Sequence, residues 1–235
     1  MRNIAVLVSL IALVFGSVAA CGAATTIYGA TGLIETPNDS IAKVGMPQLA
    51  GMYASDLLDN NRHGSSYGAA LGLLPKFEVS GVAMDPEGQT TQAILNGKFR
   101  LVDETLASPS VTVGVVDATE RLKKFNGRLD EVSAFVVIGK NLTQVAEGVA
   151  GKVVRPVKGT VGIGTGLYKG GFAGLSVSAS PKVDLDVEYL AKGISGKSTF
   201  NGAVHYTPIE GLNIGVGALR FKDVFGSVDY TLLKF

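Results

Sequence analysis

The stretch KVDLDVEYL, residues 182–190, decides the fold, because charged and apolar side chains alternate along it as far as Tyr189. A helix would scatter its carboxylates around the circumference, whereas a β-strand places them on one face. The stretch therefore predicts a strand with one ionised and one apolar face. The ionised face carries Asp184, Asp186 and Glu188, and the apolar face carries Val183, Leu185, Val187 and Tyr189.

The same period of two recurs from about residue 47 onward, for example over residues 76–83, 92–101, 199–207 and 212–218. Turns that contain proline or glycine separate many of these segments. We count about twelve strands and predict an all-β chain, a single closed antiparallel transmembrane β-barrel. The expected strand centres are Gly51, Ala70, Ser80, Asn96, Val113, Val136, Gly164, Val177, Asp186, Ala203, Val216 and Tyr230.

The first twenty residues resemble a secretory signal peptide. Arg2 supplies a positive charge, residues 4–15 are apolar apart from Ser9, and residues 16–20 are the small residues that a signal peptidase requires. The apolar run is shorter than the ~20 residues of a transmembrane helix, and no later run approaches that length. A helical membrane protein is thereby excluded, and a chain that enters a membrane does so as a closed barrel.

Cys21, the only cysteine, directly follows the expected cleavage region. The stretch VAAC, residues 18–21, resembles a bacterial lipobox, in which the cysteine becomes lipidated and anchors the mature chain through its acyl groups. The alternative is a cysteine that lies by chance beside an ordinary cleavage site. A single cysteine cannot form an internal disulfide in either case.

We divide the chain into a signal peptide (1–20), an N-terminal segment (21–46) and an outer-membrane barrel (47–235). The N-terminal segment either lies in the periplasm or plugs the lumen. The two longest connections, residues 120–131 and 142–158, are expected to be extracellular loops.

A soluble barrel or sandwich would show similar alternation. Membrane insertion is favoured because charges stay on one face and because the chain ends in Phe235, a terminal aromatic of the kind that the barrel-assembly machinery reads. Two observations oppose it. The chain has no tryptophan, and Asp229 shares a face with Phe235, where a carboxylate at the bilayer midplane would be costly. A β-bulge in the last strand would reset this register.

The ionised faces are expected to line the lumen. Opposed charges across a narrow lumen set a transverse field that orients polar solutes or excludes some ions. The alternative is that these charges pair and fill a barrel too narrow to conduct. The expected lumen-lining residues are Glu78, Lys98, Arg100, Asp184, Asp186, Glu188 and His205.

No motif points to an enzyme, a metal ion or a cofactor. His63 and His205 are the only histidines, and neither has metal-ligand spacing. The glycines of residues 162–166 alternate within a strand and open no helix, so they predict no nucleotide site. A weaker hypothesis places the active site of an outer-membrane enzyme at His205 and at the acidic stripe formed by Asp184, Asp186 and Glu188. The net charge of +1 gives no field that would attract nucleic acid.

Several short motifs, in their order along the chain, resemble the YjbH family from about Tyr28 to Tyr206. This resemblance implies an outer-membrane β-barrel lipoprotein or porin-like protein, and some family members are linked to exopolysaccharide production. The motifs are YGATGLIETPN (28–38), GLLPKFEVSG (72–81), KFRL (98–101), PSVTVGVVD (109–117), FVVIGK (135–140) and DVEY (186–189).

The leading functional hypothesis is a non-enzymatic outer-membrane barrel of YjbH type. Its partners would be outer-membrane lipid, the barrel-assembly machinery and, as a candidate, polysaccharide. It would serve envelope structure, or the passage or export of a polar solute. The alternative is a soluble periplasmic β-domain, tethered through Cys21, that acts as a binding module.

Overall fold

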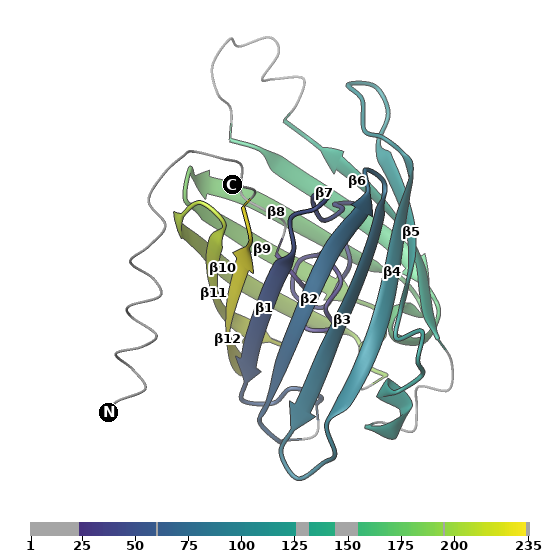
Figure 1. The fold of residues 1–235 in the computed structure, drawn as a ribbon, viewed down its shortest axis with the longest axis vertical. Coiled ribbons are helices and arrows are strands. Elements are labelled where there is room, and N and C mark those ends of the chain that lie inside the picture. The colour runs from purple at the N-terminus through teal and green to yellow at the C-terminus, as the bar shows by residue number, and fades with distance from the viewer. Residues whose placement is uncertain (1–23, 60, 126–131, 144–154, 195, 234–235) are drawn as a thin grey trace.

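In the computed structural model, the described residues are 24–59, 61–125, 132–143, 155–194 and 196–233. Twelve antiparallel strands close into one barrel, in which each strand pairs with its neighbours in sequence and β1 pairs with β12 (Figure 1). The fold class is confirmed, and every expected strand centre lies within a strand. The strands are β1 (Gln48–Ala54), β2 (Gly64–Leu74), β3 (Phe77–Pro86), β4 (Gln92–Val102), β5 (Ser110–Val116), β6 (Ser133–Asn141), β7 (Val157–Gly164), β8 (Phe172–Ser180), β9 (Val183–Leu190), β10 (Thr199–Ile209), β11 (Leu212–Leu219) and β12 (Asp223–Thr231).

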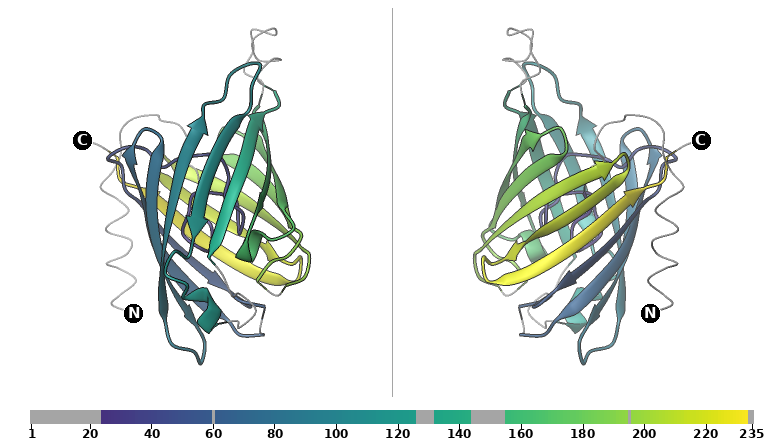
Figure 2. Two further views of the ribbon diagram at one scale, coloured as in Figure 1. Left: turned by 90° about the vertical axis from the view of Figure 1, so that its right-hand side faces the viewer. Right: turned by 90° about the vertical axis from the view of Figure 1, so that its left-hand side faces the viewer.

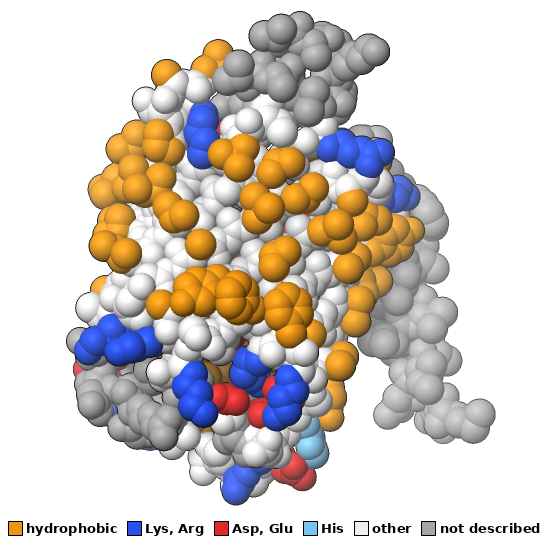
Figure 3. All heavy atoms as spheres, turned by 180° about the vertical axis from the view of Figure 1, so that it is seen from behind, with side chains coloured by type: hydrophobic (Ala, Val, Ile, Leu, Met, Phe, Trp, Pro, Cys, Tyr) orange, Lys and Arg blue, Asp and Glu red, His pale blue; other side chains and the backbone are white. Residues whose placement is uncertain are grey.

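The outer surface of the barrel is apolar around its middle. Large side chains such as Leu95, Ile163 and Val216 are more than half exposed on the outside of their strands. On the face drawn in Figure 3, hydrophobic side chains are spread over the middle of the barrel, with Lys and Arg toward both ends and Asp and Glu mainly at the lower end. An apolar middle of this kind matches the hydrocarbon layer of a membrane. Within the described ranges, no helix is long and apolar enough to cross a membrane.

The two ends of the barrel differ in their connections. β1 begins and β12 ends at the upper end in Figure 1, which we call the terminal end, and the opposite end is the far end. At the terminal end, several connections are as short as residues 75–76, 181–182 and 210–211. Connections at the far end include residues 55–63 and 191–198.

The expectation that residues 120–131 and 142–158 are both extracellular is wrong. β6 alone separates these two connections, and consecutive antiparallel strands are joined at alternate ends of a barrel. The first connection, with the 3-10 helix η1 (Leu122–Lys124), is at the far end, and the second is at the terminal end (Figure 1). Parts of both, residues 126–131 and 144–154, lie outside the described residues.

Residues 24–46, which we call the plug, lie inside the barrel. Every residue from 25 to 39 is buried, and the strands enclose the segment in each view of Figure 2. The plug has little regular structure of its own apart from isolated bridges such as Thr25 with Thr31 and Gly32 with Pro37. Of the two positions expected for the N-terminal segment, the structure shows the one inside the lumen.

The interior is divided into two halves, which differs from the expected ionised interior. In the far half, inward-facing apolar side chains pack with one another and with Ile27, Tyr28 and Ile34 of the plug. The 3-10 helix η2 (Gly166–Tyr168) adds two buried side chains. Most of the ionised inward side chains, such as Glu78, Lys98 and Asp229, lie toward the terminal half, although polar groups such as Asn201 and Asp223 are also buried toward the far end. The apolar wall residues include Met52, Met84, Ile94, Val116, Phe135, Val137, Phe172, Leu190, Leu219 and Phe225.

The last strand needs no bulge. β12 keeps a continuous register with both β1 and β11, so Val228 faces outward and Asp229 faces the lumen. The cost that Asp229 posed for membrane insertion does not arise, because the register inferred from Phe235, four residues beyond the end of β12, does not apply to the strand. Phe235 itself, the signal peptide and Cys21 lie outside the described residues.

Candidate functional site: the plugged lumen

Glu188 on β9 is the principal anchor of the plug. Its carboxylate accepts hydrogen bonds from three consecutive backbone N–H groups, those of Ile34 (3.2 Å), Glu35 (2.8 Å) and Thr36 (3.0 Å). The hydroxyl of Thr36 also donates to it (2.6 Å), as does Asn201 Nδ2 (2.7 Å). A hydrogen bond to a charged group contributes about 1.5–3 kcal/mol. One buried carboxylate therefore fixes the turn at residues 34–36.

Glu78 and Lys98 form a second anchor from directly paired positions on β3 and β4. Glu78 accepts hydrogen bonds from Thr31 N (3.0 Å), Thr31 Oγ1 (2.7 Å) and Ala42 N (2.8 Å). Lys98 Nζ donates to the carbonyl oxygens of Thr31 and Ser40, both at 2.7 Å. The carboxylate binds plug donors and the ammonium binds plug acceptors, so each charge keeps polar partners although both side chains are buried.

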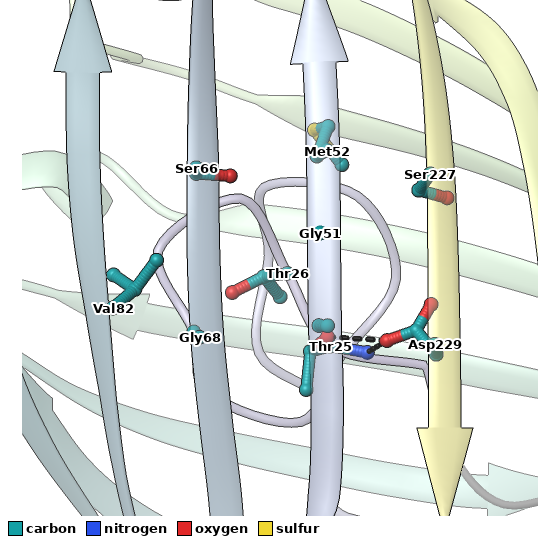
Figure 4. Close-up of a pocket in the computed structure, with 11 residues that line it drawn as sticks. Thr25, Thr26, Gly51, Met52, Ser66, Gly68, Val82, Ser227 and Asp229 are labelled. Atoms are coloured by element: carbon teal, nitrogen blue, oxygen red, sulfur yellow. Dashed lines mark hydrogen bonds between the residues drawn. The ribbon is translucent and has the colours of Figure 1, made fainter. Parts of the chain in front are cut away.

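Asp229 on β12 provides a third anchor near the start of the plug (Figure 4). It accepts hydrogen bonds from the backbone N–H of Thr25 (3.0 Å) and from the Thr25 hydroxyl. Figure 4 shows Thr25 and Thr26 behind β1, between Ser66 of β2 and Asp229. The space left here between plug and wall is about 10 Å³, no more than one water molecule needs. The lumen is closed along this wall.

Asp39 reverses the arrangement, because here the plug supplies the carboxylate and the wall supplies the cation. Lys158 Nζ lies 2.8 Å from Asp39 Oδ1, and Ser110 donates to Oδ2 (2.5 Å). Arg100 Nη2 donates to the Asp39 carbonyl oxygen (2.7 Å). Burial acts to raise the pKa of Asp39, but Lys158, the Ser110 hydrogen bond and Arg100 together outweigh it, so the pKa of Asp39 is lowered.

Glu35 is another ionisable group within the plug, and among the described residues it forms no ion pair. Its carboxylate accepts hydrogen bonds from the Tyr28 hydroxyl (3.0 Å) and from Asn201 Nδ2 (2.7 Å). Burial and the neighbouring charge of Glu188 raise the pKa of Glu35. This side chain therefore ionises at a cost in free energy when the plug is seated.

Glycines in the wall make room for the plug. A Cβ atom at Gly72 on β2 would lie 2.0 Å from the carbonyl oxygen of Ala42, and one at Gly139 on β6 would lie 2.2 Å from the Asp39 carboxyl group. At Gly174 on β8, a Cβ atom would lie 2.2 Å from Leu33 Cδ1. All three contacts are too short for any larger residue without movement. The wall sequence is therefore matched to the seated plug.

A chamber of about 220 Å³ remains between the plug and strands β7 to β11 in the terminal half. His205 spans two of its groups: Nδ1 lies 3.1 Å from Asn213 Oδ1 and Nε2 lies 3.3 Å from Asp186 Oδ2. Ser178 donates to Asp184 Oδ1 (2.6 Å). The lining residues are Ala24, Gly32, Leu33, Asn38, Ser40, Pro156, Lys158, Thr160, Ser176, Ser178, Asp184, Asp186, His205 and Asn213.

The structure places the predicted lumen residues in two groups on the inner wall. Glu78, Lys98, Arg100 and Glu188 bind the plug, whereas Asp184, Asp186 and His205 line the chamber. Sequence reasoning missed three further contributors, Asp39, Lys158 and Asp229. The alternation of residues within β12 alone would have predicted that Asp229 faces the lumen, without reference to Phe235. Across the described part of the chain, no three His, Cys, Asp or Glu side chains gather in a way that would hold a metal ion.

A closed barrel with an apolar belt outside and ionised groups enclosed within is the architecture of a bacterial outer-membrane β-barrel protein. No protein-family model matches the sequence, and no curated protein matches it. Among solved structures, the chain is similar to "KdgM porin", with a TM-score of 0.52 and 10% identity over 80% of this chain and 99% of that chain. A structure titled "KdgM porin in complex with disordered oligogalacturonate" gives a TM-score of 0.49 at 10% identity, covering 81% of this chain and 99% of that chain. The first likeness supports the barrel fold.

Proposed function

We propose that this protein is a non-enzymatic outer-membrane barrel that passes a polar solute when its own N-terminal plug leaves the lumen. The observation that carries the proposal is the chemistry of the contact between plug and wall. Glu78, Lys98 and Glu188 hold the plug through buried, ionised side chains. A barrel that is permanently filled gains little from buried charges, since apolar packing of similar volume is often as stable. An ionised wall, in contrast, is readily hydrated once the plug departs.

The arrangement of wall charges supports a polar solute. Lys98 and Arg100 project from β4, and the acidic residues project from β9, which lies nearly opposite β4 in the order of the twelve strands. After departure of the plug, these opposed charges would face each other across water. They would set the transverse field that orients polar solutes in narrow pores.

The connections suggest an orientation in the membrane. Outer-membrane barrels have short turns on the periplasmic side and longer loops outside. Three of the five connections at the terminal end, residues 75–76, 181–182 and 210–211, are two-residue turns, and this majority assigns that end to the periplasm although the long connection 142–156 is also there. The plug then enters the barrel from the periplasmic side, and the apolar core of the far half faces the cell exterior.

Membership of the YjbH family is part of this proposal. The stretch most typical of that family, residues 28–38, is the part of the plug whose backbone is held by Glu78 and Glu188. Lipidation of Cys21 stays a prediction, because this residue lies outside the described residues. An exopolysaccharide chain is a candidate solute on the strength of the resemblance alone.

Conductance across a planar bilayer tests the proposal. The intact chain is expected to be nearly silent, and a variant without residues 25–44 is expected to conduct. A locked variant, Asp39→Cys with Gly139→Cys in a Cys21→Ser background, joins plug and wall where a Cβ atom at Gly139 would lie 2.2 Å from the Asp39 carboxyl group. It should be silent when oxidised and more conductive when reduced. A plug-deleted barrel that folds but carries no current would refute passage.

A purely structural role in the envelope is the second candidate. The packed apolar core of the far half favours it, because those side chains would also have to move before a solute could cross. The same recordings decide between the two roles, since a structural barrel stays silent with or without its plug. Resistance to SDS until boiling would show that the silent, plug-deleted barrel is still folded.

A further inference from the structure

The chamber between the plug and strands β7 to β11 is not needed to hold the plug. Asp186 and His205 lie beside each other on the wall, and Asp184 accepts a hydrogen bond from Ser178 of the neighbouring strand. A volume of about 220 Å³ is many times the roughly 10–15 Å³ that one water molecule needs. The chamber is thus large enough for a small organic solute.

The charges that line the chamber are unbalanced. Asp184 and Asp186 lie on the same face of β9. Among the described lining residues, the basic side chain other than His205 is that of Lys158. Lys158 is already paired with Asp39 of the plug at 2.8 Å. The chamber therefore has a negative potential that favours a cation over an anion.

Asp186 contributes a buried carboxylate oxygen to the chamber. The residue is buried, yet among the described residues no hydrogen bond reaches its Oδ1 atom. His205 Nε2 lies beside the other oxygen, Oδ2, at 3.3 Å. A buried carboxylate oxygen without a donor costs free energy, which a donor from a bound solute would offset.

The other lining groups narrow the solute class further. The lining includes no tyrosine, phenylalanine or tryptophan on which a sugar ring could stack. It offers instead the short hydroxyl and carboxamide side chains of Ser176, Asn38 and Asn213. Ser178 and Asp184 are only partly buried, so the chamber is reached from the terminal end of the barrel.

We propose that this chamber binds a small organic cation that carries an ammonium group. The ammonium donates hydrogen bonds to Asp186 and Asp184, and the serine and asparagine side chains bind polar groups on the rest of the molecule. Binding occurs with the plug in place, because Asn38 and Ser40 of the plug form part of the lining. The site therefore does not depend on whether the lumen ever opens.

Isothermal titration of the full chain in detergent tests this site, with putrescine as the probe. Butanediol, a neutral molecule of similar length, and succinate, an anion, are the matched ligands. Putrescine alone should bind. Asp186→Asn and Asp184→Asn preserve side-chain shape and should each weaken binding about tenfold or more, because each removes a partner charge. Asp103→Asn, at an exposed carboxylate, should bind as the parent does.

Three results would overturn the proposal: no binding of putrescine, equal binding of butanediol, or unchanged binding by both chamber variants. Migration on an unheated SDS gel shows whether each variant is folded, and two independent substitutions protect against the failure of one. Conductance of the plug-deleted barrel is a separate measurement. A failure of binding would leave the passage proposal intact, and silent recordings would leave the binding site intact.

Discussion

At the residue scale, the position of the plug depends most strongly on Glu188. Its carboxylate accepts hydrogen bonds from the amides of residues 34–36, and Glu188→Gln would place an NH₂ donor against those N–H groups. We expect amide hydrogen exchange at residues 34–36 to become about 10- to 100-fold faster, as the loss of one or two such bonds implies. Exchange followed by mass spectrometry measures this, and Glu87→Gln, at an exposed side chain, is the control. Unchanged exchange in Glu188→Gln would show that another contact holds this turn.

Because of Glu35, we expect the stability of the seated plug to depend on pH. Its pKa is raised by burial and by the charge of Glu188, so ionised Glu35 destabilises the seated plug. Protonation removes this cost, and protection of the plug amides should rise as the pH falls from neutral toward about 4.3. Asp39, whose pKa is lowered, loses its contribution only below that window. In Glu35→Gln, protection should be higher at neutral pH and should depend less on pH. A variant with the pH profile of the parent would contradict this role of Glu35.

At the scale of elements, the plug and the wall are matched through glycine. Gly72→Ala would bring a Cβ atom to 2.0 Å from the backbone of Ala42, and backbone yields less readily than a side chain. We expect this variant to loosen the plug and to raise conductance above that of the parent. Gly97→Ala is the matched control, because a Cβ atom at Gly97 would lie 4.0 Å from its nearest neighbour. If both variants conduct equally little, the close approach at Gly72 does not hold the plug in place.

The elements also show what sequence reasoning could and could not reach. The period of two located the strands, because inward and outward side chains of β3, β4 and β9 have different surroundings. Inward side chains meet water or the plug, and outward side chains meet lipid. The same reasoning failed at Leu190, an inward position that is apolar because it joins the far core. The plug contacts were out of reach, since Glu188 and Thr36 are 152 residues apart and the anchored groups are mostly backbone amides, which leave no trace in sequence.

At the scale of the whole molecule, the division of the interior into two halves gives each half a separate task. The far half packs like the core of a soluble domain and closes the barrel through apolar burial. The terminal half holds the plug by hydrogen bonds and contains the chamber. Because the far core includes Ile27, Tyr28 and Ile34, departure of the plug also removes side chains from that core. Release of the plug and loosening of the far end are therefore coupled.

The opened barrel should be selective for cations. The wall of the terminal half carries more carboxylates than cations, and selectivity in such a lumen follows the sign of the wall charge. In the variant without residues 25–44, a KCl gradient should give a reversal potential that shows preference for K⁺ over Cl⁻. Asp184→Asn, Asp186→Asn and Glu188→Gln together should move that potential through zero toward preference for Cl⁻, because two carboxylates then face three cations, whereas Asp103→Asn should leave it unchanged. Preference for Cl⁻ before these substitutions would mean that Lys98, Arg100 and Lys158 dominate the open lumen. These three cations are opposed by the carboxylates of Glu78, Asp184, Asp186, Glu188 and Asp229.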